Sequence, residues 1–493
     1  MGISSKVVAN KLADIFTELK NSDYLANPFF RISKATPEQM RKYQYINSKS
    51  SRITVLIHLL IAIPINIGKI FIYLFFSFIF FNQYRVYNYA TNKSEILFLS
   101  HAIGENITKT DGDQFFALMP ENLQKKSKKV SILYTNHSLF GYYKNNNSLK
   151  TKGISIERHL IPKFLKPLEN IDYLKLTIPA SMKCLFYGLK KLLSNPIEST
   201  LLIKSSLFFY SRSTYSNYLV GQRVKEFCMK NNIEILVMTF EGHSYEQYII
   251  EKIYKSNPKI SIVLYQHSPI VTDHFGVQNF LKVNTRDLRI LTTGIAYERM
   301  FKSISNIPKY HILGSNKAIS NFVEDHTISQ KQILFAPEGT AFATIKFLKL
   351  MNYLCQMDRK LLFSIRLHPN LKRNFIVFLF IKRLNLKGNF LLSNNLLHED
   401  LKKSKFVFYR SSAVGIEALM SNAVPVYYNS STELGLNVLG KYSEFIPVVT
   451  NYTDTLNYIR TASTNISKEM RRSISNEIFT EIDYEKLSLI LKN

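Results

Sequence analysis

The alternation of short apolar runs with amphipathic segments, from Glu95 onward, constrains the fold of this chain most strongly. Ten short apolar runs, in two successive sets of five, have the length of buried strands, and the segments between them have the amphipathic pattern of helices. The first set is Ile96–Leu99, Val130–Tyr134, Ile233–Thr239, Ile260–Tyr265 and Leu288–Leu291; the second is Ile333–Ala336, Leu361–Arg366, Phe390–Leu392, Phe406–Tyr409 and Val424–Tyr428. Strands that alternate with helices form parallel sheets. The pattern therefore predicts an α/β chain with two Rossmann-like domains in tandem.

Shifts in the same pattern predict the domain boundaries. A Leu- and Lys-rich helical region covers about Ile161–Met229, and a polar linker, Ser315–Gln330, separates the two sets of strands. Glu469–Leu491 has the pattern of one closing helix. We expect a basic helical segment over 1–52, a first Rossmann-like domain over 95–314 that serves the acceptor, and a second over 331–493 that serves a nucleotide-sugar and ends in the closing helix.

Length and charge narrow the class of protein. A chain of 493 residues is too long for one core, and 46% hydrophobic residues against 20% charged ones argue for packed domains. The formal net charge of +28 attracts anionic partners, which include nucleic acid, an anionic membrane face and acidic substrates. We find no zinc-finger spacing, aromatic RNA-binding pattern or basic zipper, so only the charge favours a nucleic-acid partner, and we expect none. The three cysteines, Cys184, Cys228 and Cys355, form no paired motif, which favours a reducing cytoplasm.

The apolar run Ile53–Phe81 is the one membrane candidate. It is long enough to cross a bilayer, but Pro64 would kink a helix and Lys69 lies near the middle of the run. We therefore predict a kinked, monotopic or peripheral contact with the membrane over 53–81, with flanking cations at the headgroups. The alternative is a buried pair of hydrophobic helices.

In the first domain, titratable residues follow two predicted strands. Glu241, Gly242 and His243 come directly after Ile233–Thr239, and His267 follows Ile260–Tyr265. A carboxylate at the carboxyl end of a strand can act as general base on an acceptor hydroxyl. The alternatives are that Glu241 only caps the next helix and that His267 only supports a loop.

The second domain repeats this arrangement at three turns. Glu338 and Gly339 follow its first strand, where Glu338 either accepts from a ribose or sugar hydroxyl or caps a helix. Arg366, His368 and Pro369 end its second strand, and a fixed histidine there suits a donor phosphate. Arg410, Ser411 and Ser412 precede an Ala/Gly/Leu helix, where two hydroxyls suit an anion or simply cap the helix.

Taken in order, these motifs resemble a family of bacterial surface-carbohydrate biosynthesis proteins. They are also distantly similar to the bacterial GT-B sialyltransferases and polysialyltransferases, which share an acidic-acidic-Gly base motif, a His-Pro motif and a Ser-Ser/Thr motif that bind a CMP-sugar. The resemblance covers roughly Ile233–Tyr428. It implies a GT-B arrangement in which the two domains face a cleft. It also implies that Glu241 is the general base, His368 the general acid or phosphate ligand, and Ser411 and Ser412 the phosphate binders. Phe240 replaces the first acidic residue of the base motif.

These inferences together predict a membrane-associated glycosyltransferase of O-antigen or capsule biosynthesis. It would transfer a sugar, such as a nonulosonic or Kdo-type acid from its CMP ester, to a glycan or lipid-linked glycan at the cytoplasmic face of the inner membrane. No cofactor is expected besides the donor substrate, and no metal, because Asp111 and Asp113 have metal-ligand spacing but follow no predicted strand. The alternatives are a GT-B transferase that uses a UDP- or GDP-sugar and a non-catalytic polysaccharide assembly factor.

Overall fold

The structure is a computed structural model of the 493-residue chain. It describes residues 94–102, 112–136, 156–318, 332–421, 423–429, 437–462 and 466–492, apart from short gaps at 163, 272–273, 285, 369–370, 372–373 and 385–388. Five isolated residues of the apolar run, Pro64, Gly68, Phe71, Ile72 and Phe75, are also described, and all five are helical. The prediction for 1–52, and the rest of that for 53–81, lie outside the described residues. Among the helices that the structure does describe, none is both long enough and apolar enough to span a bilayer.

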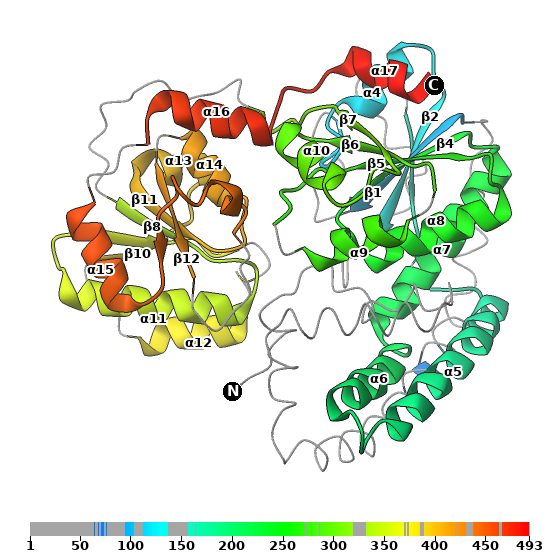
Figure 1. The fold of residues 1–493 in the computed structure, drawn as a ribbon, viewed down its shortest axis with the longest axis horizontal. Coiled ribbons are helices and arrows are strands. Elements are labelled where there is room, and N and C mark those ends of the chain that lie inside the picture. Colours follow the sequence, from blue (N-terminus) through cyan, green and yellow to red (C-terminus); the bar gives the residue numbers. More distant parts are fainter. Residues whose placement is uncertain are drawn as a thin grey trace.

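The first domain contains a seven-stranded, fully parallel sheet (Figure 1). Its strands are β1 (Ile96–Ala102), β2 (Val130–Asn136), β3 (Glu157–Leu160), β4 (Ile235–Thr239), β5 (Ser261–Tyr265), β6 (Arg289–Thr292) and β7 (Lys309–Ile312). The order β3-β2-β1-β4-β5-β6-β7 reverses direction between β1 and β4. This order is typical of a doubly wound sheet.

Helices cover both faces of this sheet because successive residues of its strands point to opposite sides. Leu97 and Leu99 of β1 join the core with α7 (Arg212–Asn231), α8 (Ser244–Ser256), α9 (Phe275–Val283) and α10 (Ile295–Lys302). Ile96 and Phe98 join a second core with α4 (Met119–Lys125) and the C-terminal α17 (Tyr484–Lys492). Both faces of the strands are buried, which explains their continuous apolar runs.

The second domain repeats this architecture with six parallel strands. They are β8 (Gln332–Ala336), β9 (Leu362–Ile365), β10 (Phe390–Leu392), β11 (Ser404–Tyr409), β12 (Val424–Tyr428) and β13 (Val448–Val449), in the order β10-β9-β8-β11-β12-β13. α11 (Ala341–Met357), α12 (Phe375–Arg383) and α15 (Tyr452–Thr461) pack on one face, and α13 (Leu397–Lys403) and α14 (Val414–Met420) on the other. A short 3₁₀ helix, η7 (Gly440–Tyr442), precedes β13. The prediction of two Rossmann-like domains is confirmed.

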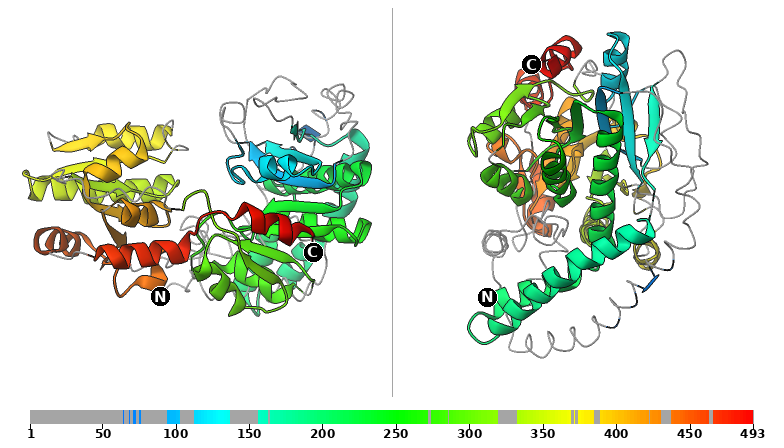
Figure 2. Two further views of the ribbon diagram at one scale, coloured as in Figure 1. Left: turned by 90° about the horizontal axis from the view of Figure 1, so that it is seen from above. Right: turned by 90° about the vertical axis from the view of Figure 1, so that its right-hand side faces the viewer.

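The C-terminal segment links the two domains. The expectation of one closing helix over Glu469–Leu491 is wrong, because α16 (Lys468–Ile478) ends at Phe479, where the backbone becomes extended. The N–H of Thr480 donates to the carbonyl of Thr293 at 2.8 Å, and its own carbonyl accepts from Ser315 at 2.7 Å. These bonds to the first domain replace helical ones. α16 contacts α14 of the second domain and α10 of the first, and α17 packs against α4 (Figure 2).

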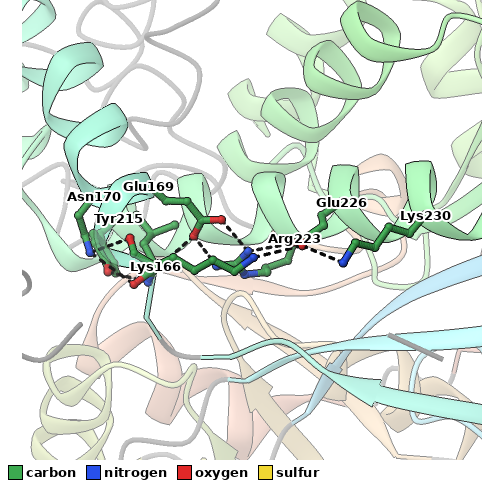
Figure 3. A network of polar contacts seen from close by, with 8 residues as sticks. Lys166, Glu169, Asn170, Tyr215, Arg223, Glu226 and Lys230 are labelled. Carbon is green, nitrogen blue, oxygen red and sulfur yellow. Dashed lines mark hydrogen bonds and ion pairs between the residues drawn. The ribbon is translucent and has the colours of Figure 1, made fainter. Parts of the chain in front are cut away.

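A helical hairpin, formed by α5 (Pro167–Lys190) and α6 (Pro196–Phe208), projects from the first domain (Figure 1). A polar network joins the start of α5 to α7 (Figure 3). Arg223 of α7 is buried and donates through Nη1 to Glu169 at 2.8 Å and to Glu226 at 2.8 Å. Lys166 and Lys230 complete the network around Glu226 at 3.3 and 3.4 Å. The hairpin is therefore anchored at its base by charge-assisted hydrogen bonds.

Candidate functional site

The two sheets reverse their strand order between β1 and β4 and between β8 and β11. In doubly wound sheets, ligands bind outside the carboxyl ends of the strands at such a switch point, because the loops there separate in opposite directions. His101 and Glu241 stand at the ends of β1 and β4, and Glu338 and Arg410 at the ends of β8 and β11. Four titratable residues thus mark the two switch points.

Glu241 is the centre of the cluster in the first domain. Its Oε2 lies 2.8 Å from Nε2 of His243, and its Oε1 accepts from the hydroxyl of Ser268. Nε2 of His267 lies 3.6 Å from the same Oε1. The carboxylate is mostly buried, and His243, Ser268 and His267 all belong to the loops after β4 and β5. The structure therefore brings Glu241, His243 and His267 together, as expected of side chains at adjacent strand ends.

Gly242 allows the turn that holds Glu241. Its φ is +73°, a region that L side chains rarely adopt, and a Cβ there would lie 2.5 Å from the backbone nitrogen of Val277. The backbone of α9 therefore passes directly over this turn. Any larger residue at this position would separate α9 from the loop that carries Glu241.

Glu246, and not Glu241, caps α8. Its two carboxylate oxygens accept from the backbone N–H of Glu241 and of His243, each at 2.9 Å. Complete burial raises the pKa of Glu246 to about 7, although His243 and these two hydrogen bonds oppose the shift. Glu246 thus accepts from the backbone N–H groups at the start of α8, while the side chain of Glu241 contacts His243 and Ser268.

His101 joins the same site from β1, and the sequence analysis missed it. Its Nδ1 lies 2.5 Å from the hydroxyl of Thr135, and its Nε2 lies 3.1 Å from that of Thr239 and 3.0 Å from that of Tyr245. His101 lies two residues after the predicted strand Ile96–Leu99, the same offset that separates Glu241 and His267 from their strands, so the rule that identified those two residues also identifies His101. Phe115 packs edge-to-face against both His101 and His267, with ring centroids 5.3 and 4.9 Å apart.

In the second domain, the turns after β8 and β11 meet. The hydroxyl of Ser411 donates to Oε2 of Glu338 at 3.1 Å, and Nε of Arg410 lies 3.7 Å from the same oxygen. Glu338 and Arg410 are both buried. Thr340 caps α11 through its hydroxyl, which accepts from Ala343. Glu338 is therefore held beside Arg410 and Ser411, and the capping alternative for it is not realised.

The turn after β9 lies against the same cluster. A Cβ on Gly339 would lie 2.9 Å from Nδ1 of His368, so His368 packs directly over the backbone that follows Glu338. Glu338, Gly339, His368, Arg410 and Ser411 thus form one group at the switch point. Pro369 lies outside the described residues.

Arg366 and Ser412 make more local contacts. Nη1 of Arg366 donates to the carbonyl of Asn395 and, at 3.0 Å, to Oδ2 of the buried Asp400. The hydroxyl of Ser412 accepts from the backbone N–H of Val414 at 3.3 Å, which is a local turn bond, because the N-cap of α14 is Ala413. Burial raises the pKa of Glu417 in α14, with Lys317 and Arg366 opposing the shift.

The described residues include no group of three or more His, Cys, Asp or Glu side chains arranged to hold a metal ion. Asp113 is buried and accepts from the hydroxyl of Ser100 and from the backbone of Phe115 and Phe116, which gives it a structural role. All three cysteines are buried, and burial raises the pKa of Cys184 to about 12 and that of Cys355 to about 11. Their thiols are therefore protonated at neutral pH and are poor nucleophiles.

No protein family and no curated protein matches this sequence. Among solved structures, the chain is similar to a putative UDP-N-acetylglucosamine 2-epimerase from Listeria monocytogenes, with 10% identity and a TM-score of 0.49 over 81% of this chain and 96% of that one. It is similar to the UDP-GlcNAc 2-epimerase from Methanocaldococcus jannaschii in complex with UDP-GlcNAc and UDP (9% identity, TM-score 0.48, 80% and 99% covered). It is also similar to CalG4, the calicheamicin glycosyltransferase (9% identity, TM-score 0.47, 82% and 98% covered). The chemistry of this chain therefore has to follow from its own residues.

Proposed function

We propose that this chain is a metal-independent glycosyltransferase that moves a sugar from a nucleotide-sugar donor to a glycan acceptor of a surface polysaccharide. The observation that carries this proposal is the position of Glu241 at the switch point of the first sheet, held by His243 and Ser268. A second polar cluster occupies the equivalent point of the second sheet. Ligand sites in doubly wound sheets lie at such points.

Glu241 serves as the general base on the acceptor. The acceptor oxygen forms a bond to the anomeric carbon of the sugar while the bond from that carbon to the donor phosphate breaks, and the hydroxyl proton passes to Glu241. His243 and Ser268 fix the direction of the carboxylate. A general base must first lie within hydrogen-bond reach of the proton that it accepts, and its pKa is the second requirement. Phe240, at the position of the first acidic residue in the sialyltransferase motif, is buried against Phe280 and Phe301, so Glu241 acts as the single acid of this turn.

The cluster of the second domain serves the donor. His368 and Ser411 offer an imidazole and a hydroxyl to the departing phosphate, the buried Arg410 adds a positive charge beside them, and the carboxylate of Glu338 accepts from a sugar or ribose hydroxyl. The packing of His368 against Gly339 and the bond from Ser411 to Glu338 keep these groups together. By the resemblance of its motifs, we propose a CMP-activated nonulosonic or Kdo-type acid as the donor, and the two domains facing one cleft in a GT-B arrangement.

We also propose that the enzyme works at the cytoplasmic face of the inner membrane, with 53–81 as a peripheral or monotopic contact. Polar substitution of this segment is expected to move the protein from the membrane fraction to the soluble fraction. Nucleotide binding should persist, because the segment is far in sequence from every motif of the site. If the substituted protein unfolds or aggregates, the segment is part of the hydrophobic core.

The test of function is a donor screen. CMP-, UDP- and GDP-sugars are compared for the shift in melting temperature and for nucleotide release in the presence of lipid-linked acceptor. His368→Ala, or Ser411→Ala, should weaken binding of the active nucleotide about tenfold or more, because each change removes a hydrogen bond to a phosphate. Lys405→Ala, an exposed change on β11, is the control. If only a UDP- or GDP-sugar shifts the melting temperature and releases its nucleotide, that sugar replaces the proposed CMP-sugar as the donor. If no nucleotide-sugar releases its nucleotide, the chain is a non-catalytic assembly factor.

A further inference from the structure

The α5/α6 hairpin has an inverted distribution of side chains. On α5, the buried residues are mostly small or polar, namely Asn170, Thr177, Ala180, Ser181, Cys184 and Gly188, with Tyr173 near the base. The large apolar residues Leu168, Ile171, Ile178, Met182, Phe186 and Leu189 are exposed instead. At 3.6 residues per turn, these six fall within about 80° of one another around the helix. A surface helix of a water-soluble domain has the opposite arrangement.

The contact between α5 and α6 fits this inversion. Gly188 approaches α6 so closely that a Cβ would lie 2.8 Å from the side chain of Ile203. The hydroxyl of Ser181 donates to the carbonyl of Ser206 at 2.9 Å. Small residues and hydroxyl bonds between helices, with large apolar residues outward, are typical of helices that pack in lipid.

A second exposed apolar surface lies on α12 of the other domain. Its sequence is apolar from Phe375 to Ile381, and Phe375, Ile376, Phe378 and Leu379 are exposed, Phe375 by 70%. Figure 1 shows α12 below α11 at the lower edge of the second domain, and α5 and α6 at the lower edge of the first. α17 lies at the opposite end of the molecule (Figures 1 and 2). α12 and the α5/α6 hairpin therefore lie toward the same end of the molecule, and each exposes apolar side chains.

Both surfaces carry cations and few acids. α5 carries Lys175, Lys183 and Lys190 against Glu169 and Asp172, and residues 173–197 contain four Lys and no Asp or Glu. α12 carries the exposed Lys382 and Arg383 in its last turn and no Asp or Glu. On α5, Lys183 and Lys190 are exposed, and at 100° per residue they border the apolar stripe. Cations beside an apolar face match the headgroups of an anionic bilayer, with the apolar side chains at the acyl boundary.

We infer that the exposed stripe of α5 and the exposed face of α12 form a docking surface for an anionic lipid bilayer, on which the hairpin lies in the interface without crossing it. This contact is separate from the proposed contact over 53–81. It is also independent of the proposed glycosyltransfer, because it needs neither donor nor acceptor.

The test is co-sedimentation of the full-length protein with vesicles, without nucleotide. Vesicles of phosphatidylcholine alone are compared with vesicles of equal parts phosphatidylcholine and phosphatidylglycerol. Two double variants remove apolar side chains, Met182→Gln with Phe186→Gln on α5 and Phe375→Gln with Phe378→Gln on α12. The control, Leu489→Gln on α17, changes a side chain that is also exposed, at the opposite end of the molecule.

The parent should bind the anionic vesicles more strongly than the neutral ones, and 1 M NaCl should weaken that preference. Each double variant should lower the partition coefficient by at least about tenfold, since every removed aromatic ring takes several buried carbons from the acyl boundary. Leu489→Gln should bind as the parent does. If the α5 variant lowers the melting temperature, Leu168→Gln with Ile171→Gln replaces it, because both residues belong to the exposed stripe.

Two results would overturn the inference. One is vesicle binding by both double variants at the level of the parent, which would assign the membrane contact elsewhere. The other is a change from dimer to monomer in light scattering of the α5 variant while vesicle binding persists, which would make the stripe an interface between two copies of the chain. If the double variants lose vesicle binding but keep the parent's melting-temperature shift with nucleotide-sugars, the result supports the docking surface independently of the proposed reaction.

Discussion

Replacement of Arg223 by Met tests the network that anchors the hairpin. The side chain of Arg223 is only 2% exposed and holds Glu169 and Glu226, whose side chains are 24% and 23% exposed. Loss of one partner from a buried charged network costs about 3–5 kcal/mol. Partial exposure of the two carboxylates lowers this cost through solvent screening, so we expect about 3 kcal/mol. For a domain of this size, that corresponds to a fall in melting temperature of about 6–12 °C.

The assay is thermal unfolding followed by circular dichroism, with Lys309→Met as the control. Lys309 also pairs with a carboxylate, that of Asp287 at 2.9 Å, but both side chains are about two-thirds exposed. Such a pair contributes at most about 1 kcal/mol. A shift for Arg223→Met no larger than that for Lys309→Met would refute the reasoning that burial makes this network important.

The dependence of the melting temperature on pH gives a second test of Arg223→Met. Burial tends to raise the pKa of Glu226, but Arg223 and Lys166 outweigh it, so the pKa lies below its ordinary value. The resulting stabilisation is complete above the unfolded pKa of about 4.5 and is lost as pH falls through the folded value. Because Arg223→Met removes part of this depression, the melting temperature of the variant should fall less steeply than that of the parent below pH 4.5.

Three further predictions concern the site. Gly242→Ala should lower the melting temperature and transfer together, because its Cβ would meet the backbone of Val277 in a left-handed conformation; normal activity in a folded variant would show that this turn has no part in catalysis. Gly339→Ala should displace His368 and weaken nucleotide binding, measured by calorimetry, with little change in melting temperature; unchanged affinity would remove His368 from the donor site. The pKa of Glu246 is raised to about 7, so its contribution to stability is complete below pH 4.5 and is lost as pH rises through 7. The melting temperature of the parent should therefore fall relative to that of Glu246→Gln between pH 5 and pH 8, and parallel curves would contradict the raised pKa.

The strands that the sequence predicted are those with continuous apolar runs. β4 and β5 are buried on both faces, so their runs are unbroken and their carboxyl ends could be located, whereas the predicted end of β1 fell three residues short because Ser100 and His101 interrupt its apolar run. β3 and β7 were missed because they lie at the edges of the first sheet, where polar residues such as Glu157 and Lys309 are tolerated, and β13 was missed because it has only two residues.

The candidate site could be predicted only where a motif follows a strand. Glu241, His267, Glu338 and Ser411 were found in this way. Glu246 was missed because its capping role depends on its burial and on the path of the backbone before α8. The exposed stripe of α5 could not be distinguished from a core-facing stripe, because the same periodicity predicts both. Only the packing of α5 against α6 shows which face is buried.

The most direct measurement of the central claim is transfer by Glu241→Gln beside nucleotide binding by the same variant. Glutamine keeps the shape of the side chain and cannot take the acceptor proton. We predict that the variant binds the donor nucleotide as the parent does, while turnover falls by roughly 10²–10⁴. Near-normal transfer by Glu241→Gln would contradict its role as the base and leave the cluster of His243, Ser268 and Glu241 as support for a loop.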